Sequence, residues 1–296
     1  MKNKFLDFFN SPTDILFHLY NLLVCLFVII FHDQIHIAYT LILSHLIIAF
    51  GYYYIKKITA ENNSHSYISI IFTIMTLSFL HYESGMLNLI IFPEYFDDIV
   101  RSLDIHLFGL APYKIADNYL NHPFIVQFFH FFYFSYYLIL FIPILLILKK
   151  ETYYNSIPSG STERSFFLLL FSMFACYIIF IIFPVKGPTD IHFEIFNKYN
   201  SLVGFLDFIY KYGDTHGGAM PSSHVAVSLV ITVQSYHYLK KLFPYILCTF
   251  IFLTISTVYC SFHYGVDAIA GLVGGLIFYY LGESLYNFTQ ERLGGE

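Results

Sequence analysis

The sequence is poor in charge, cysteine and tryptophan. Asp, Glu, Lys and Arg make up 12% of its 296 residues, about half of the roughly 25% found in soluble domains, which argues against a soluble protein. The net charge of −5 argues against nucleic acid as a partner, because such binding selects a basic surface. The four cysteines lie in apolar runs without a Cys-x-x-Cys pair, so we interpret them as small buried hydrophobic residues. Tryptophan is absent, which leaves the 27 tyrosines as candidate interfacial anchors.

Long apolar segments dominate the chain instead. Hydrophobic residues make up 57% of it, and its apolar runs of about 17 residues or more can cross a bilayer core of about 30 Å as helices. Lipid offers the backbone no hydrogen-bond partners, so helices are the expected form. We therefore predict an all-α, polytopic transmembrane helical bundle of about eight spans with a six-helix catalytic core. The spans are expected near residues 15–31, 36–55, 66–82, 122–148, 164–183, 222–239, 243–260 and 264–286.

We divide this compact unit into N-terminal membrane helices (1–95), a catalytic core (96–288) and a C-terminal tail (289–296). Lys2 and Lys4 precede the first apolar stretch, as in a signal peptide, but no small-residue cleavage site follows them. The first apolar segment is therefore expected to stay in the protein as a span.

The distribution of lysine and arginine predicts the orientation in the membrane. With eight spans, one side receives both termini and ten basic residues: Lys2, Lys4, Lys56, Lys57, Lys149, Lys150, Arg164, Lys240, Lys241 and Arg292. The other side receives five, spread over the long connections 83–121 and 184–221: Arg101, Lys114, Lys186, Lys198 and Lys211. Basic residues near span ends favour the cytoplasm. Both termini are therefore predicted to be cytoplasmic, and the two long connections extracytoplasmic or lumenal.

Three segments with candidate catalytic residues reach that second side of the membrane. FPVKGPTD (183–190) follows the fifth span, GGAMPSSHVAVS (217–228) opens the sixth, and STVYCSFHYGVDAIAG (256–271) covers the turn from the seventh to the eighth. The predicted topology alone brings all three to one membrane face, as an active site requires.

His263 and Asp267 form the first candidate pair. They are four residues apart, so on a helix they share one face. A carboxylate in that position can accept a hydrogen bond from one imidazole nitrogen and leave the other nucleophilic. With 14 histidines in the chain, one such spacing is nearly expected by chance. Asp267 nevertheless lies at the mouth of a span, where an unpaired carboxylate is costly.

The segment 217–228 predicts an anion site at the start of a helix. Pro221 suits the first helical position, and the helix start after Gly217 and Gly218 offers backbone N–H groups to an anion. His224 lies one turn inside and can face the same anion, or it can simply hydrogen-bond at the headgroup level. Ser222 and Ser223 are candidates for binding the phosphate directly, or for capping the helix.

Together these residues predict phosphoryl transfer. His263 would attack phosphorus, Asp267 would orient and support its imidazole, and His224 would protonate the leaving oxygen. The resulting phosphohistidine would then pass its phosphoryl group to water or to an alcohol.

The motif MPSSH, followed by Ser256, His263 and Asp267, resembles the type 2 phosphatidic acid phosphatase superfamily. FPVKGP, GGAMPSSH and YCSFHYGVD are more similar to its inositol phosphorylceramide synthase-like (inositolphosphotransferase) branch, as is LDIHLFGLAP (103–112). The resemblance covers residues from about 100 to 285. It implies that His263 is the nucleophile, Asp267 its partner and His224 the acid. It also implies catalysis without a metal or other cofactor.

The sequence departs from the phosphatase pattern where arginines are expected. Thr257 follows the serine of the third motif, as in the sphingolipid transferase branch, and Thr189 follows Gly187-Pro188. The phosphate charge would then be met by Lys186, His216 or backbone N–H groups such as that of Gly218. Lys186 has the alternative of an interfacial lysine whose charged end reaches water.

The predicted enzyme is an integral membrane lipid phosphotransferase or phosphatase. Its partners would be the bilayer, a phospholipid or lipid-phosphate donor, and a lipid alcohol acceptor of the ceramide or diacylglycerol type. A pure lipid-phosphate hydrolase is the first alternative, and a non-enzymatic transporter or scaffold with a decayed site the second. Neither the oligomeric state nor the identity of the lipid follows from the sequence. The acidic group Glu94, Asp97, Asp98 and Asp104 predicts an interfacial amphipathic helix.

Overall fold

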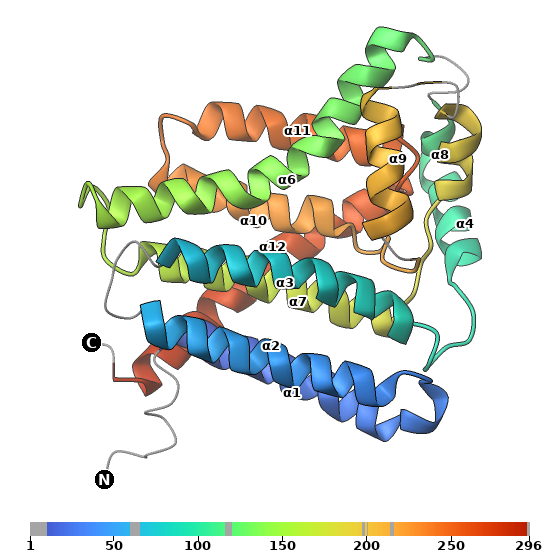
Figure 1. The fold of residues 1–296 in the computed structure, drawn as a ribbon. Helices are drawn as coiled ribbons and strands as arrows, with labels where there is room; N and C mark the ends of the chain where they lie inside the picture. Colours follow the sequence, from blue (N-terminus) through green and yellow to red (C-terminus); the bar gives the residue numbers. More distant parts are fainter. Residues whose placement is uncertain are drawn as a thin grey trace.

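The computed structural model describes residues 11–59, 66–115, 120–196, 199, 201–213 and 216–294. Eight long helices occupy the positions predicted from the apolar runs, and the all-α class is confirmed (Figure 1). They are α1 (Pro12–Ile30), α2 (Ala38–Thr59), α3 (Ser66–Leu87), α6 (Pro123–Thr152), α7 (Ser161–Ile182), α10 (Ser223–Tyr238), α11 (Phe243–Tyr259) and α12 (Gly265–Arg292). In the described chain, extended pairing is limited to an isolated bridge between Val185 and Gly218.

The two long connections contain helices of their own. The first holds α4 (Asp97–Phe108) and the 3-10 turn η4 (Pro112–Lys114), and the second holds α8 (Thr189–Phe196) and α9 (Leu202–Gly213). A further 3-10 turn, η2 (His32–Gln34), links α1 to α2. In Figure 1, α4, α8 and α9 gather at the right-hand end of the bundle. This end also carries the first turns of α10 and α12.

Short polar signals determine where the helices begin and end. Ser11 caps α1 by accepting a hydrogen bond from the Asp14 N–H, and Pro12 occupies the first turn. His122 caps α6 in the same way through Phe124, again with a proline next in the chain. Gly109 ends α4 with a φ of 68°, in the left-handed region that glycine adopts without a steric penalty.

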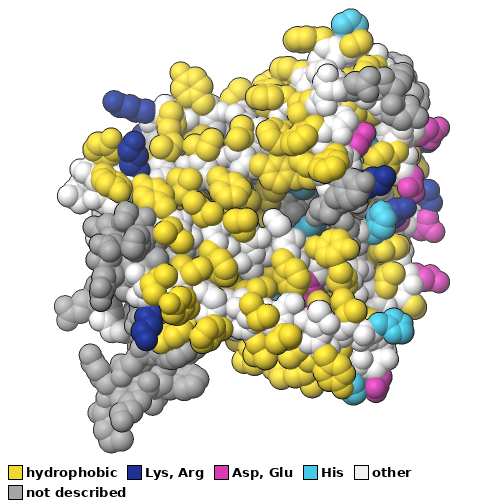
Figure 2. Space-filling model, in the orientation of Figure 1, with side chains coloured by type: hydrophobic (Ala, Val, Ile, Leu, Met, Phe, Trp, Pro, Cys, Tyr) yellow, Lys and Arg dark blue, Asp and Glu magenta, His cyan; other side chains and the backbone are white. Residues whose placement is uncertain are grey.

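Among the described residues, six helices are long and apolar enough to cross a membrane: α1, α2, α3, α6, α7 and α12. Helix α11 is a shorter apolar helix, and α10, with 16 residues, is shorter still. The outer face of α2 exposes large apolar side chains, among them Ile47 (62%) and Phe50 (69%), which would be costly in water and suits lipid. Figure 2 shows hydrophobic side chains between two ends where charged side chains gather. The chain is therefore a multi-pass membrane protein.

Helix α7 lies at the centre of the bundle, against α1, α3, α6, α10 and α12. Phe167, Leu169 and Phe180 are among its buried side chains. They belong to one apolar core that also takes residues from α1, α2, α3, α6, α10 and α12. The N-terminal helices therefore pack as part of the same bundle as the motif-bearing helices. The division at residues 95 and 96 remains a prediction.

Candidate active site

His263 lies in the short turn between α11 and α12, and it is 4% exposed. The carbonyl oxygen of Thr257 accepts hydrogen bonds from the backbone N–H groups of Phe262 and His263, at 3.3 and 3.0 Å. Ser261 has a φ of 57°, and its hydroxyl donates to the carbonyl oxygen of Tyr113 at 2.6 Å. A serine in the left-handed region is strained, so these bonds fix the tight turn that places the imidazole.

The contacts of the His263 ring determine its tautomer. Its Nδ1 atom lies 2.9 Å from the carbonyl oxygen of Ala219, and a carbonyl oxygen can only accept a hydrogen bond. Nδ1 therefore carries the proton, and in the neutral ring Nε2 has the lone pair. Nε2 lies 3.2 Å from the hydroxyl oxygen of Ser222, which donates to it.

Asp267 lies in the first turn of α12 and is fully buried. Its Oδ2 atom accepts from the backbone N–H of Tyr264 at 2.8 Å and is 3.6 Å from His263 Nδ1. That separation is too long for a good hydrogen bond, so the acceptor expected from the spacing is supplied by Ala219 instead. The carboxylate remains close enough to interact with a positive charge on the imidazole. Its Oδ1 atom has no hydrogen-bond partner among the described residues.

His224 lies in the first turn of α10, and its imidazole faces that of His263. The two ring centroids are 5.6 Å apart, and the ring planes meet at 68°. Tyr133 stacks on His224 with a centroid distance of 4.8 Å, and Tyr136 lies 4.2 Å away. Two histidines that are 39 positions apart in the sequence thus converge, and aromatic rings of α6 pack against His224.

A close approach of α10 and α12 brings the two motifs together. A Cβ atom on Gly271 would lie 2.7 Å from the Ser222 carbonyl oxygen, and one on Gly275 would lie 2.8 Å from that of Ala226. The backbone N–H of Ser222 also donates to the carbonyl oxygen of Asp267 at 3.1 Å. Gly271 and Gly275 therefore let the backbones of α10 and α12 approach closely. A Cβ atom on Gly274 would meet only ordinary van der Waals contacts.

Helix α10 begins later than predicted. Ser222 is its N-cap residue and Ser223 its first residue, so Pro221 precedes the helix and does not occupy its first position. The Ser222 hydroxyl does not cap the helix, because it contacts His263 instead. The first N–H groups of a helix have no intrahelical acceptor. The first N–H groups of α10 lie beside the two imidazoles, where they can donate hydrogen bonds to an anion.

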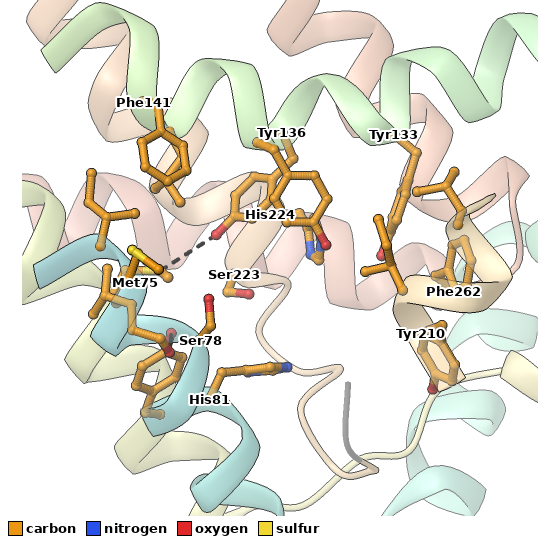
Figure 3. Close-up of a pocket in the computed structure, with 18 residues that line it drawn as sticks. Met75, Ser78, His81, Tyr133, Tyr136, Phe141, Tyr210, Ser223, His224 and Phe262 are labelled. Carbon is orange, nitrogen blue, oxygen red and sulfur yellow. Dashed lines mark hydrogen bonds between the residues drawn. The ribbon is translucent and has the colours of Figure 1, made fainter. Parts of the chain in front are cut away.

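An apolar cavity of about 180 Å³ leads away from His224 (Figure 3). Ser223 and His224 line it from α10, and Tyr133 and Tyr136 from α6. Helix α3 lines the opposite side with Met75, Ser78 and His81, as Figure 3 shows. A water molecule occupies roughly 30 Å³ in the liquid. The cavity is therefore large enough for part of an organic ligand.

Two aspartates of α4 hold the first and third motif segments in place. The carboxylate of Asp97 accepts hydrogen bonds from the backbone N–H groups of Lys186 and Gly187, at 2.8 and 2.9 Å, and from the Tyr264 hydroxyl at 3.0 Å. Asp104 accepts from the backbone N–H groups of Gly265 and Val266, at 3.1 and 2.8 Å.

Asp104 therefore caps α12, the helix that carries Asp267. Burial raises the pKa of Asp104, and its two backbone hydrogen bonds act in the opposite direction. The predicted helix around the acidic group exists as α4. The capping roles of Asp97 and Asp104 were not predicted, although the segment 103–112 had been singled out by its resemblance.

Asn88, the residue directly after α3, is a further residue that the sequence did not single out. Its Nδ2 atom donates to the carbonyl oxygen of His216 at 2.6 Å. Gly217, with a φ of 101°, packs so closely on Asn88 that a Cβ atom would collide with the amide. Gly218 bridges to Val185, and packs against His81 and Phe180. Helix α3 thus supports the segment that leads into Ser222 and His224.

The structure places only some of the candidate phosphate-binding residues beside the two imidazoles. Ser222 and Ser223 lie at the two imidazoles or at the cavity beside them. The Lys186 ammonium instead forms an ion pair with Asp190 at 2.8 Å. His216 is exposed. Neither Lys186 nor His216 is among the hydrogen-bond partners of His263 in the described chain.

Thr257, which stands where an arginine was expected, has its hydroxyl turned back into α11, where it donates to the carbonyl oxygen of Thr254 at 2.8 Å. Among the described residues, no three His, Cys, Asp or Glu side chains are grouped so that they could hold a metal ion.

Comparison with known proteins identifies the family of the chain. Residues 102–281 match the model of the PAP2 superfamily. A PA-phosphatase related-family protein of Dictyostelium discoideum is 31% identical over 106 residues, which cover 33% of this chain and 19% of the relative. The chain thus matches about a fifth of that relative's length, and no solved structure matches. The match to the family model spans more than half of the sequence and includes Lys186, His224, His263 and Asp267, so the chain belongs to the PAP2 superfamily.

Proposed function

We propose that this protein is a lipid phosphotransferase or phosphatase that works through a phosphohistidine on His263. Members of the PAP2 superfamily are generally phosphatases or phosphotransferases, and a membrane-embedded member would act on lipid phosphates. The observation that carries the proposal is the convergence of His224 and His263, with ring centroids 5.6 Å apart. The protonation of His263 on Nδ1 supports it, because the nucleophilic lone pair then lies on Nε2.

In the first step, Nε2 of His263 attacks the phosphorus of the lipid donor. A P–N bond forms while the P–O bond to the leaving group breaks, and His224 gives its proton to the departing oxygen. The imidazole of His263 gains positive charge in this step. Asp267, with Oδ2 at 3.6 Å from Nδ1, favours that charge electrostatically.

Ser222 has to change partners during this step. Its hydroxyl donates to Nε2 in the structure, so attack requires it to turn away from the nucleophile. A phosphate oxygen at the start of α10 is the acceptor to which the hydroxyl would turn. The N–H groups of the first turn of α10 would bind other oxygens of the phosphate.

In the second step, an acceptor O–H attacks the phosphorus of the phosphohistidine. His224, now neutral, takes the proton of the acceptor, the P–N bond breaks, and His263 returns to its starting form. Water as acceptor gives hydrolysis, and an alcohol gives transfer. The two reactions share their first step and differ only in the acceptor.

We favour transfer to a lipid alcohol of the ceramide or diacylglycerol type. The resemblance of GGAMPSSH and of Thr257 to the inositolphosphotransferase branch supports this choice. The cavity beside His224 supports it as well, because its tyrosine, methionine and leucine lining suits the apolar part of a lipid. A pure lipid-phosphate hydrolase remains the alternative. It would show no dependence of product formation on an added lipid alcohol.

The active site is proposed to face the extracytoplasmic or lumenal side. The end of the bundle with His224 and His263 is opposite to the end with Lys150, Lys240 and Lys241. Basic residues at span ends favour the cytoplasm. Both termini would then be cytoplasmic.

The experiment is an assay of the purified protein on lipid donors with radiolabelled phosphate, with and without a lipid alcohol. The wild type should form product and an acid-labile phosphoenzyme, and His263→Ala should form neither. His36→Ala is the matched control, because this exposed histidine follows η2, away from both imidazoles. Equal turnover by His263→Ala and the wild type would refute the proposal and favour a non-enzymatic transporter or scaffold.

A further inference from the structure

A second cavity, of about 790 Å³, lies at the end of the bundle opposite to His263. It opens between the C-terminal ends of α6 and α10, the N-terminal end of α7 and the later turns of α12. The residues that line this cavity lie outside the motif segments and take no part in the proposed reaction. Lys and Arg side chains are also visible at this end in Figure 2, at the left edge of the view.

The lining of this cavity is strongly basic. Lys150, Arg164, Lys240 and Lys241 line it, and Glu283 is the one acidic side chain among its described lining residues. Arg164 forms an ion pair with Glu283, with a distance of 2.7 Å from Nε to Oε2. Three lysines are therefore left without an acidic partner in the lining. Their ammonium groups create a positive potential that attracts an anion.

Only part of the hydrogen-bonding capacity of these lysines is used in the structure. Lys150 donates one hydrogen bond, from Nζ to the carbonyl oxygen of Tyr238 at 2.9 Å. An ammonium group has three N–H donors and no acceptor. The cavity therefore offers several charged donors to a ligand that is rich in acceptor oxygens.

Gln234 provides an independent observation that points to a ligand. This side chain lines the cavity and is 1% exposed. Its Oε1 atom accepts from the Ser165 hydroxyl at 3.0 Å, which directs Nε2 elsewhere. Nε2 has no hydrogen-bond partner among the described residues. A buried donor without an acceptor costs about 1–3 kcal/mol, and an oxygen atom of a ligand in the cavity would remove that cost.

We propose that this cavity binds a phosphate group carried by the headgroup of an anionic lipid. A phosphate supplies negative charge and acceptor oxygens together, which is the combination that three lysines and the Gln234 amide require. A lipid is the favoured source because the cavity opens between the ends of membrane-spanning helices. The headgroups of one leaflet lie next to these helix ends, and basic pockets between spans suit anionic headgroups. Free inorganic phosphate offers the same chemistry from solution.

The test measures binding to the purified full-length protein in detergent micelles. The probes are dioctanoyl phosphatidylinositol 4-phosphate, inorganic phosphate, and dioctanoyl phosphatidylcholine as a headgroup without net charge. Microscale thermophoresis should give saturable binding of the phosphoinositide. Lys240→Glu should weaken it about tenfold or more, because a hydrogen bond to a charged group is lost and a negative charge is added. Gln234→Met, which keeps the side-chain length but removes the amide, should weaken it by roughly threefold to tenfold.

Lys149→Glu is the matched control. It makes the same change of charge at the neighbouring position of α6, but Lys149 does not line the cavity. Binding that falls with Lys240→Glu and not with Lys149→Glu supports the site. Inorganic phosphate that binds as tightly, with the same dependence on Lys240, also supports a phosphate site and assigns it to the soluble ion. Three results would overturn the proposal: no saturable binding of either phosphate probe, equal losses in the two lysine variants, or equally tight binding of phosphatidylcholine.

Discussion

His263 Nδ1 lies closer to the carbonyl oxygen of Ala219, at 2.9 Å, than to Asp267 Oδ2, at 3.6 Å. The backbone carbonyl alone is sufficient to hold the proton on Nδ1 and leave Nε2 as the nucleophile. Orientation and electrostatic support of the imidazole thus come from two different groups. In many histidine sites a single carboxylate does both.

The separate roles of the Ala219 carbonyl and the Asp267 carboxylate predict the behaviour of Asp267→Asn. The amide oxygen of Asn can still accept from the Tyr264 N–H, so the fold of the first turn of α12 should survive. The ring should also keep its tautomer through Ala219. The loss should therefore come mainly from the missing negative charge, and kcat should fall by about 10²-fold to 10³-fold. Steady-state kinetics beside a thermal-unfolding curve measure this, and an unchanged kcat would contradict an electrostatic role for Asp267.

His224 is predicted to act on the leaving group. With a lipid alkoxide as leaving group, His224→Gln should lower kcat by about 10²-fold to 10⁴-fold, the usual contribution of a general acid. An aryl phosphate has a leaving group that departs without a proton, so the same variant should lose much less activity on it. Glutamine can retain packing between Tyr133 and Tyr136, which separates a loss of acid function from a loss of structure. Equal losses on both substrates would assign His224 to phosphate binding instead.

The apolar runs of the sequence were sufficient to predict the helices and the end of the bundle where the motifs meet. Each run is long enough that burial or lipid contact determines its conformation. Successive spans run in opposite directions, so their order determines which helix ends lie on the same side of the membrane. The convergence of His224 and His263 follows from that topology together with the small residues of α12. Gly271 and Gly275 are two such residues.

The supports of the site could not be predicted, because they depend on contacts between distant residues. Asp104 caps α12 from a position 161 residues before Gly265, and Asn88 holds His216 across 128 residues. No local spacing indicates either pair. The partner of Lys186 is different: Asp190 is four residues away in the sequence, and this i,i+4 spacing is typical of an ion pair.

Gly271 and Gly274 offer a matched pair of alanine substitutions. A Cβ atom at Gly271 would lie 2.7 Å from the carbonyl oxygen of Ser222 and 2.9 Å from Val225 Cβ, so Gly271→Ala forces α10 away from α12. We expect a loss of about 1–3 kcal/mol in stability and a fall in activity, because Ser222 and His224 move with α10. At Gly274 the nearest atoms are 3.4 Å or more away. Gly274→Ala should be neutral or stabilising by up to about 1 kcal/mol through helix propensity. Thermal stability and turnover of both variants test this, and equal effects would contradict the close approach.

A buried polar network in the N-terminal helices leads to the last prediction. His45 is 1% exposed, and its Nδ1 atom lies 2.7 Å from Asn21 Oδ1, while its Nε2 lies 2.8 and 2.9 Å from the two carboxylate oxygens of Glu83. The Asn21 amide donates to the Phe17 carbonyl oxygen at 2.8 Å, so Oδ1 faces the ring and Nδ1 must carry a proton. A second proton is then shared between Nε2 and the carboxylate, and the pair is held together as one hydrogen-bonded unit.

Removing one partner of this pair should be worse than removing both. Glu83→Leu or His45→Leu alone leaves a buried polar group unpaired and should cost about 3–5 kcal/mol of stability, whereas replacing both by leucine should cost much less. Because the pair joins α2 to α3, and Asn21 links it to α1, the single variants should also loosen the support that α3 gives to the active site through Asn88, and lower kcat. A double-mutant cycle of thermal stability in micelles measures the coupling. Strictly additive effects of the two substitutions would mean that His45 and Glu83 do not stabilise each other, and that the helices are held by apolar packing alone.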